Sequence, residues 1–317
     1  MVNNITKIMC FGEPLVGFFT KEETKKELPV FKMAIGGDTS NLALGVSKLG
    51  HQSTYTTRLG NDFFAEKIKE LWEKEGIDTK YVFNDDNNQT GVYFAIYNSQ
   101  GAHNFIYKRK DSASAYYSIK DAKKVSLNGI QVFHLSGISQ AISNSCMEAS
   151  FYFMKKCKQS NIFISYDLNY RSSLWSKEYF KSIAFYTISN FANLVSLNLS
   201  EAEVLGLKGK PKEIVKQILV MGPKMVALKL GKDGCVIGSS EEGIYYGEPF
   251  KVQSTLETTG AGDSLTAAVI VGILERMELK KMTRFANAVA SIVCSSIGST
   301  VGQPTRDNVE KFLKDKK

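Results

Sequence analysis

The chain has 317 residues, of which 43% are hydrophobic and 23% charged, and its formal net charge is +8. This length allows a large buried core in one or two domains, and the composition excludes disordered and fibrous classes. The positive charge makes an anionic partner a natural candidate. Because the basic residues are scattered, without an arginine-rich tract, an anionic small substrate explains the charge as well, and nucleic acid is the weaker choice.

Cysteine usage and the N-terminal sequence bear on the compartment. The five cysteines are far apart without a C-x-x-C motif, which is typical of reduced thiols that serve as small hydrophobes. The three histidines show no metal-ligand spacing, and we expect structural roles for His51, His103 and His134. No signal-peptide run and no stretch of membrane-spanning length is present, so we expect a cytoplasmic protein without a membrane partner.

The N-terminal part of the chain predicts alternating strands and helices. An apolar run at 7–11 indicates a buried strand. Residues 18–31 then place the charged stretch KEETKKE between aromatic ends, which predicts an exposed excursion such as a hairpin. A helix is expected within 36–50, a strand at 54–58 and a helix over 62–76.

The segment GGDTSN opens the first of these helices. Gly36 and Gly37 turn the chain, and Asp38 or Thr39 can cap the helix. Asn41 lies early in the helix, where its amide can contact a ligand or make an ordinary first-turn hydrogen bond.

Two β-rich runs at 90–97 and 103–109 surround the sequence NSQG at 98–101, a signal for a hairpin. Three residues with polar ends lie on these runs: Tyr93, Tyr107 and Arg109. These three side chains are either ordinary exposed residues or one face that covers a ligand.

The rest of the chain predicts a parallel sheet with helices on both faces, because strands and helices alternate. Strands are expected at 131–135, 162–167, 194–198, 225–229, 234–238 and 243–246. Helices are expected at 145–158, 177–190, 200–206, 211–221, 264–276 and 280–296, with a last one from Thr305. No internal repeat or low-complexity segment interrupts this order.

Polar residues follow several of these strands, and the carboxyl ends of parallel strands meet at one edge of a sheet. They are Asp167, Asn169 and Arg171 after one strand, Asn198 and Glu201 after another, and Gly231 after a third. We therefore expect a ligand site at that edge.

The stretch TTGAGDSLTAAVIVGI completes the site hypothesis. Gly260 and Gly262 permit a tight turn, and a helix that starts there adds first-turn N–H groups and its positive dipole end, which together favour an anion. If the anion is a phosphate in transit, Asp263 can take a proton from the attacking hydroxyl. The alternative is an ordinary N-capped helix. The P-loop pattern G-x-x-x-x-G-K-[ST] is absent.

An ordered set of motifs resembles the ribokinase-like (PfkB-type) carbohydrate kinases over about residues 8–304. The motifs are GG-x-x-x-N at Gly36, Gly37 and Asn41, LGND at 59–62, N-x-x-E at 198–201, KLGKDG at 229–234 and TTGAGD at 258–263. The resemblance implies an α/β fold: a ribokinase-like three-layer α/β/α sandwich with a mostly parallel central sheet and a small β-sheet lid. The catalytic domain would comprise residues 1–13, 36–88 and 111–317, and the lid would comprise 14–35 and 89–110.

The resemblance also implies roles for individual residues. Asp263 would be the catalytic base, with an anion hole formed by Gly260, Ala261, Gly262 and Asp263. The sugar acid would contact Gly36, Gly37, Asn41, Tyr93, Tyr107, Arg109, Arg171 and Asp263. ATP would contact Asn169, Asn198, Lys229, Gly231, Gly234, Gly260, Gly262 and Asn287. Asn198 and Glu201 would organise Mg²⁺ through water.

Within the family, the chain is similar to 2-keto-3-deoxygluconate kinases. This similarity lies in GEPLVGF at 12–18, in Tyr107-x-Arg109 followed by SAS at 112–114, in HLSGISQAIS at 134–143 and in YDLNYRSSLW at 166–175. Two arginines aimed at the pocket favour an acid over a neutral sugar, because a buried guanidinium needs a partner. Arg171 could instead pair with Asp167 or Glu201. We therefore expect phosphorylation of the C6 hydroxyl of 2-keto-3-deoxygluconate, and the alternative is a fructokinase or another sugar kinase of this type.

Two positions depart from the family pattern. Glu257 stands where relatives have the Asp that helps bind a monovalent cation, so potassium dependence stays open. Gly17 replaces an acidic residue that contacts sugar hydroxyls in many relatives. Self-association through the lid is an option that the resemblance leaves open. From other classes, a non-catalytic sugar–nucleotide sensor and a nucleic-acid-binding module are the alternatives.

Overall fold

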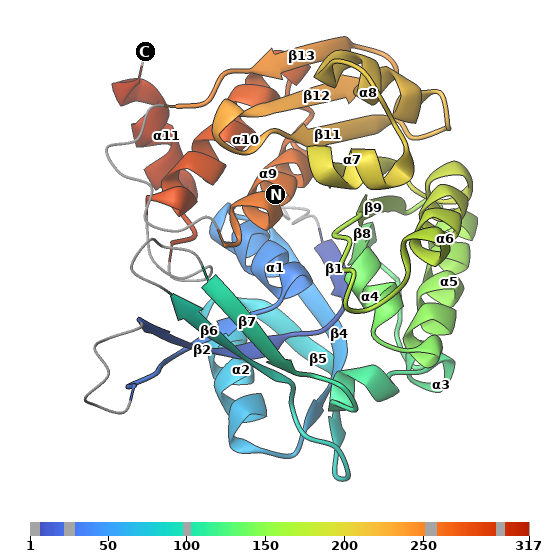
Figure 1. The fold of residues 1–317 in the computed structure, drawn as a ribbon, viewed down its shortest axis with the longest axis vertical. Coiled ribbons are helices and arrows are strands. Elements are labelled where there is room, and N and C mark those ends of the chain that lie inside the picture. Colours follow the sequence, from blue (N-terminus) through green and yellow to red (C-terminus); the bar gives the residue numbers. More distant parts are fainter. Residues whose placement is uncertain (1–6, 22–28, 98–102, 251–258, 296–301, 317) are drawn as a thin grey trace.

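The computed structural model describes residues 7–21, 29–97, 103–250, 259–295 and 302–316. Its centre is a nine-stranded sheet with the strand order β13-β12-β11-β10-β9-β8-β1-β4-β5 (Figure 1). The strands are β1 Lys7–Phe11, β4 Gln52–Gly60, β5 Ile77–Asp85, β8 Ile130–Ser136, β9 Phe163–Asp167, β10 Leu194–Asn198, β11 Met225–Lys229, β12 Cys235–Ser239 and β13 Gly243–Gly247. All pairs from β5 to β11 are parallel, and β12 and β13 add an antiparallel edge.

The order of the strands creates a crevice beside β1. From β1 the chain adds β4 and β5 on one side, and from β8 it adds strands on the other side. The direction in which successive strands are added to the sheet therefore reverses between β1 and β8. In open parallel sheets, ligands bind beyond the carboxyl ends of the strands at such a reversal.

Two apolar cores cover the two faces of the sheet. Side chains alternate along β1, so that Ile8 and Cys10 enter one core while Met9 and Phe11 enter the other. The first core is closed by α1 Asp38–Lys48, α2 Phe63–Lys74, α9 Ala261–Leu274, α10 Leu279–Cys294 and α11 Arg306–Asp315. The second is closed by α5 Asn144–Gln159, α6 Lys177–Asn190, α7 Leu199–Leu205 and α8 Pro211–Leu219, with the short helices α3 Ile119–Ala122 and α4 Gly137–Ala141 nearby.

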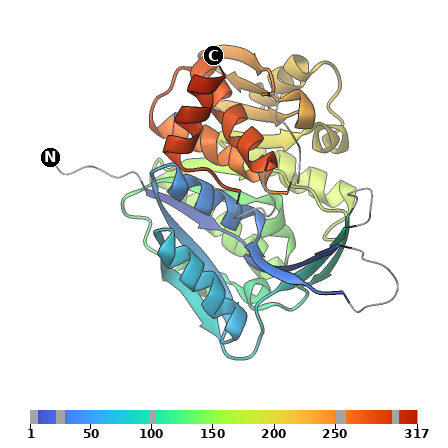
Figure 2. The ribbon, with the colours of Figure 1, turned by 90° about the vertical axis from the view of Figure 1, so that its left-hand side faces the viewer.

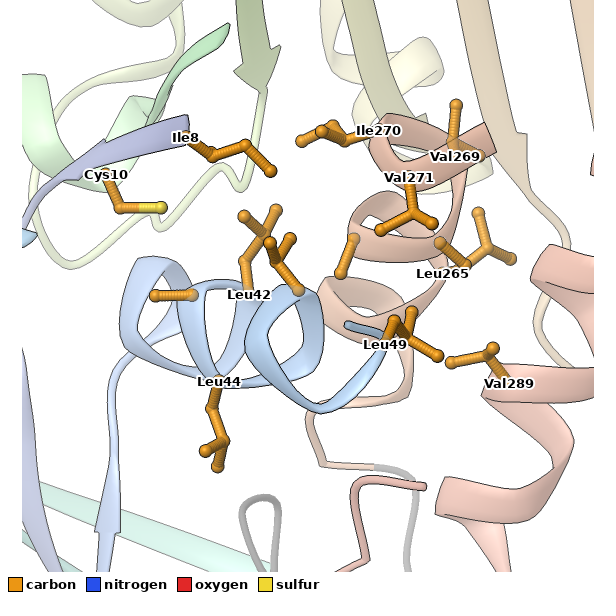
Figure 3. Close-up of a cluster of buried hydrophobic side chains, with 14 of the residues drawn as sticks. Ile8, Cys10, Leu42, Leu44, Leu49, Leu265, Val269, Ile270, Val271 and Val289 are labelled. Carbon is orange, nitrogen blue, oxygen red and sulfur yellow. The ribbon is translucent and has the colours of Figure 1, made fainter. Parts of the chain in front are cut away.

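Helix α9 is buried on nearly every side, as expected for a helix that is apolar all round. It lies beside α1 in the first core, where Leu42 of α1 and its C-cap Leu49 share the cluster with Leu265 and Val271 of α9 (Figure 3). A methyl group added at Gly45 of α1 would lie 3.1 Å from the Cβ atom of Ala267 of α9. Gly45 therefore lets the two helices approach closely.

A second, four-stranded sheet has the order β3-β2-β6-β7 and stands off the body (Figure 2). Its strands are β2 Leu15–Lys21, β3 Lys32–Gly36, β6 Val92–Tyr97 and β7 His103–Lys108. β2 and β3 pair antiparallel, as do β6 and β7, while β2 and β6 are parallel. The strand pairs of both predicted hairpins are therefore present, although residues 22–28, with most of the charged stretch, and the NSQG turn lie outside the described residues.

The fold class is confirmed: a mostly parallel central sheet with helices on both faces and a small separate sheet. Two local predictions were wrong. The N-cap of α1 is Gly37, and neither Asp38 nor Thr39, because Asp38 is already the first helical residue. Helix α9 starts at Ala261, three residues earlier than expected, so Asp263 belongs to its first turn. No helix in the described part of the chain has the length and apolar character needed to cross a bilayer.

Candidate active site

The site is built around the first turn of α9. Its N-cap, Gly260, has φ 81°, a left-handed backbone that favours glycine. The first α-helical hydrogen bond runs from the amide of Ser264 to the carbonyl of Gly260. The amides of residues 261–263 belong to the first turn, where a helix leaves its N–H groups without intrahelical partners, so the turn can offer donors to an anion.

Asp263 lies in this turn, and its carboxylate accepts a hydrogen bond of 2.8 Å from the side-chain amide of Asn41. Burial, and then the negative charge of Asp38, raise the pKa of Asp263 to about 7, although the Asn41 bond and the charge of Lys229 act to lower it. A carboxylate with such a pKa exchanges a proton near neutral pH, which suits a general base. The carbonyl oxygen of the Asn41 side chain is buried and has no hydrogen-bond partner among the described residues.

Asp38 was considered only as a helix cap, yet it is part of the site. Its Oδ2 atom accepts a hydrogen bond of 2.9 Å from the side chain of Asn169, and Oδ1 accepts one of 2.8 Å from the amide of Thr39. Asn169 has φ 37°, within the left-handed region that asparagine tolerates better than most residues. This backbone follows β9 directly and holds Asn169 against the start of α1.

The ends of β9 and β11 are joined by an ion pair. The ammonium of Lys229 lies 2.8 and 3.0 Å from the two carboxylate oxygens of Asp167. The hydroxyl of Thr266 on α9 also donates to Asp167, at 3.1 Å. Asp167 therefore pairs with Lys229. The alternative in which Arg171 pairs with Asp167 was wrong.

Asn198 and Glu201 form a reciprocal cap at the start of α7. The side chain of Asn198 accepts from the amide of Glu201 at 2.9 Å, and Glu201 accepts from the amide of Asn198 at 2.8 Å. Glu201 also accepts from the amide of Tyr170 at 3.1 Å. Burial raises the pKa of Glu201, while the charge of Lys229 opposes the rise.

Arg109 has a partner, contrary to the expectation of an unpaired guanidinium. It forms an ion pair with Glu13, which is 1% exposed and also accepts a hydrogen bond of 2.9 Å from Ser112. Burial raises the pKa of Glu13, and Arg109 and Ser112 oppose that rise. The Nε atom of Arg109 remains buried without a hydrogen-bond partner among the described residues. Arg171 is exposed and donates to the carbonyl of Tyr170 at 2.9 Å.

The small sheet contributes an aromatic wall. The rings of Tyr93 and Tyr107 stack with centroids 5.7 Å apart. Tyr93 also explains why position 17 is glycine: a Cβ atom on Gly17 would lie 2.7 Å from the Tyr93 hydroxyl. Any longer side chain at position 17 would displace this tyrosine.

The elements above enclose one cavity of about 770 Å³. Its lining includes all the predicted site residues except Gly36, which ends β3 close to the Tyr93 hydroxyl. Residues that the sequence did not single out also line it: Glu13, Leu15, Asp38, Phe105, Ile138, Lys232, Pro249, Phe250, Thr259, Leu265, Ala290, Ser291 and Cys294. Glu13 and Asp38 could have been predicted as site residues, because Glu13 follows the first strand and Asp38 follows a double glycine.

Two of the predicted nucleotide residues, Gly234 and Asn287, lie in the part of the cavity near α10. Gly234 has φ 85°, and a side chain there would collide with the carbonyl of Gly247. The side chain of Asn287 donates to the carbonyl of Glu248 at 3.4 Å. Glu257, the departure that bears on a monovalent cation, lies outside the described residues.

Comparison with known proteins agrees with this geometry. Residues 5–306 match the model of the pfkB family carbohydrate kinases. The chain is 29% identical over 312 residues to a 2-dehydro-3-deoxygluconokinase of Bacillus subtilis, covering 96% of this chain and 94% of the relative. It is 27% identical over 318 residues to fructokinase-1 of Zea mays, covering 96% and 97%. The crystal structure of a fructokinase with bound ATP from Xylella fastidiosa superposes with a TM-score of 0.86 at 19% identity, covering 98% of each chain. The fold, the match over nearly the whole chain and the shared motifs lead to one conclusion: the protein belongs to the pfkB family of carbohydrate kinases.

Proposed function

We propose that the protein is an ATP-dependent sugar-acid kinase that phosphorylates the C6 hydroxyl of 2-keto-3-deoxygluconate, with Asp263 as general base. The observation that carries the proposal is the environment of Asp263. This carboxylate has a pKa raised to about 7 and lies in the first turn of a helix, within a cavity large enough for two substrates.

The chemistry assigns Asp263 the proton of the sugar hydroxyl. The hydroxyl oxygen attacks the γ-phosphorus of ATP while its proton passes to the Asp263 carboxylate. The bond from γ-phosphorus to the bridging oxygen breaks, and its electron pair stays on ADP. The amides of Ala261 and Gly262 stabilise the charge on the transferred group, because they belong to a helix terminus.

The donor set of Asn198 and Glu201 fits a Mg²⁺ ion held through water. Mg²⁺ prefers oxygen ligands and keeps several waters. The Glu201 carboxylate already accepts two backbone amides, which leaves acceptor sites for water. The described residues contain no group of three or more His, Cys, Asp or Glu side chains that could hold the ion directly. When bound, Mg²⁺ would neutralise charge on the ATP phosphates.

Two arginines support an acid substrate. The buried Nε donor of Arg109 and the exposed guanidinium of Arg171 both line the cavity and suit a carboxylate. The similarity to the Bacillus subtilis 2-dehydro-3-deoxygluconokinase points the same way.

One observation favours the second candidate, a fructokinase or another pfkB-type sugar kinase. Because Glu13 already balances the charge of Arg109, a neutral sugar would not leave that guanidinium unpaired. The similarity to the Zea mays fructokinase is close to that of the first relative.

We further propose that the small sheet, residues 14–35 and 89–110, acts as the lid and that its outer face binds a second copy. Met33, Phe18, Phe94 and Ile106 form one row across the four strands. Phe18 packs against Phe64 of α2, whereas Met33 and Ile106 are 42% and 43% exposed and would form the contact. Phe94→Glu should convert an oligomer to a monomer in sedimentation experiments, and a wild-type monomer would contradict the proposal.

The substrate test is ADP release measured with 2-keto-3-deoxygluconate, related keto-deoxy acids, fructose and ribose. We expect the keto-deoxy acid to give the highest kcat/KM, and phosphorus NMR to show a C6 phosphate ester. Preference for fructose would select the second candidate. No ADP release with any sugar would contradict both.

A further inference from the structure

Lys229 lies where its ammonium can contact a bound phosphate group. It is the last residue of β11, its side chain is 15% exposed, and it lines the cavity. Its ammonium makes both of its described hydrogen bonds to the carboxylate of Asp167. An ammonium has three donors, so one remains for a ligand within the described part of the site.

Asp167 fixes the position of this ammonium. Its carboxylate is 4% exposed and also accepts a hydrogen bond of 3.1 Å from Thr266. The Thr266 hydroxyl is in turn 2.8 Å from the hydroxyl of Ser196 on β10. Thr266 of α9, which is itself bonded to Ser196 of β10, therefore fixes the carboxylate that holds Lys229.

The lysine reaches the turn at the start of α9. A Cβ atom built on Gly262 would lie 3.4 Å from Cδ and 3.7 Å from Nζ of Lys229. The positive charge is thus next to the backbone amides that face the anion site. Burial lowers the pKa of Lys229, but the charges of Asp167, Glu201 and Asp263 outweigh it and raise that pKa overall, so the ammonium stays charged.

We infer that Lys229 contacts the phosphoryl group in transfer and neutralises the charge that grows on it, with Asp167 as the residue that positions the ammonium. The inference rests on the proposed phosphoryl transfer. A charge that the protein holds in place before the reaction stabilises the transition state more than it stabilises the bound nucleotide. The alternative is that the ion pair only connects β9 to β11 and takes no part in catalysis.

The test compares Lys229→Met with Lys224→Met, which removes the same charge at an exposed position immediately before the start of the same strand. Calorimetry without metal would measure affinity for ADP and for the β,γ-imido analogue of ATP, and kcat would be measured separately. For Lys229→Met we expect a loss of about 100- to 1,000-fold in kcat, as for an oxyanion donor. The analogue should bind about tenfold more weakly while ADP affinity changes less than about twofold. Lys229→Arg should restore part of kcat, and Lys224→Met should resemble wild type.

Two further variants separate positioning from stability. Asp167→Asn should lower kcat by about tenfold and leave ADP affinity unchanged, because the ammonium remains but is less well fixed. Since Lys229→Met leaves a buried carboxylate unpaired, the double variant Asp167→Asn/Lys229→Met keeps the site neutral and should show the same selective loss. Equal losses for ADP and the analogue, or a near-normal kcat in the double variant, would overturn the inference. A wild type that releases no ADP with any sugar would contradict the proposed function instead.

Discussion

The side-chain amide of Asn41 donates a 2.8 Å hydrogen bond to the carboxylate of Asp263, across 222 positions of sequence. Asn41 lies on the first turns of α1, and Asp263 on the first turn of α9. The bond stabilises the ionised carboxylate and so opposes the burial and the Asp38 charge that raise its pKa to about 7. The protonation of the proposed base therefore depends on residues far apart in the chain.

Asn41→Ala should move the acid limb of the kcat/KM profile to higher pH, because the carboxylate loses a donor to its charged form. At pH 6 we expect kcat/KM to fall by about tenfold, since a hydrogen bond to a charged group contributes about 1.5–3 kcal/mol. Above pH 8 kcat/KM should rise to a plateau, which stays below that of the wild type because Asn41 is also a predicted contact of the sugar. The measurement is a profile from pH 5 to 9.

Asp38→Asn is the opposite case. It removes the negative charge that raises the pKa of Asp263, while an amide oxygen can still accept from Asn169. The acid limb should therefore move to lower pH. A shift in the same direction for both variants would contradict this account of the site.

Asp263→Asn should lower kcat by about 1,000-fold or more while ATP affinity is kept, because general-base catalysis contributes about 10²–10⁴-fold.

The same substitution, Asp263→Asn, should also stabilise the fold. The raised pKa means that folding favours the protonated acid, so wild-type stability falls as pH rises from about 4 through about 7. The Tm gain of the variant should thus be larger at pH 8 than at pH 5. The exposed Asp315→Asn is the control, and an equal gain at both pH values would be inconsistent with the raised pKa.

Glu13→Gln should favour acids over neutral sugars. The substitution keeps the shape of the buried side chain but leaves the Arg109 charge without its counter-ion. We expect the ratio of kcat/KM for the keto-deoxy acid to that for fructose to rise by about tenfold, as for a charge-assisted hydrogen bond. Arg109→Met should lower the same ratio. If neither variant changes it, Arg109 does not contact the substrate carboxylate.

Cys294 should report nucleotide binding. It is half-buried on the cavity wall, whereas the other four cysteines are buried. Burial raises the pKa of Cys294, so labelling by a maleimide should be slow at pH 7 and faster at pH 8.5. ATP should slow it severalfold, and mass spectrometry should place the label on this cysteine. Equal rates with and without ATP would argue against a nucleotide beside α10.

Most of the sheet and its helices could be predicted from the sequence, because buried strands and amphipathic helices have distinct periods. β10, Leu194–Asn198, and α6, Lys177–Asn190, have the predicted bounds. β5, Ile77–Asp85, was missed because this edge strand is only partly buried and lacks a clear apolar alternation. The start of α9 was placed late because glycines at 260 and 262 argue against a helix when no tertiary contact is known.

The composition of the cavity could also be predicted in large part, since strand ends in a parallel sheet converge. The pairing inside it could not. Periodicity shows neither that Glu13 neutralises Arg109 nor that Asp167 selects Lys229 over Arg171, because such pairs depend on side chains that meet only in the folded chain.

The contact between Gly45 and Ala267 lies one helical turn below the pair formed by Asn41 and Asp263. A single methyl group at position 45 would contact Ala267 too closely and would move the two helices apart by a few tenths of an ångström. The hydrogen bond from Asn41 to Asp263, the proposed base, would lengthen although no reacting atom had been changed. Inactivating mutations of this kinase should therefore also arise deep in the hydrophobic interior, where they would at first be taken for mere folding defects.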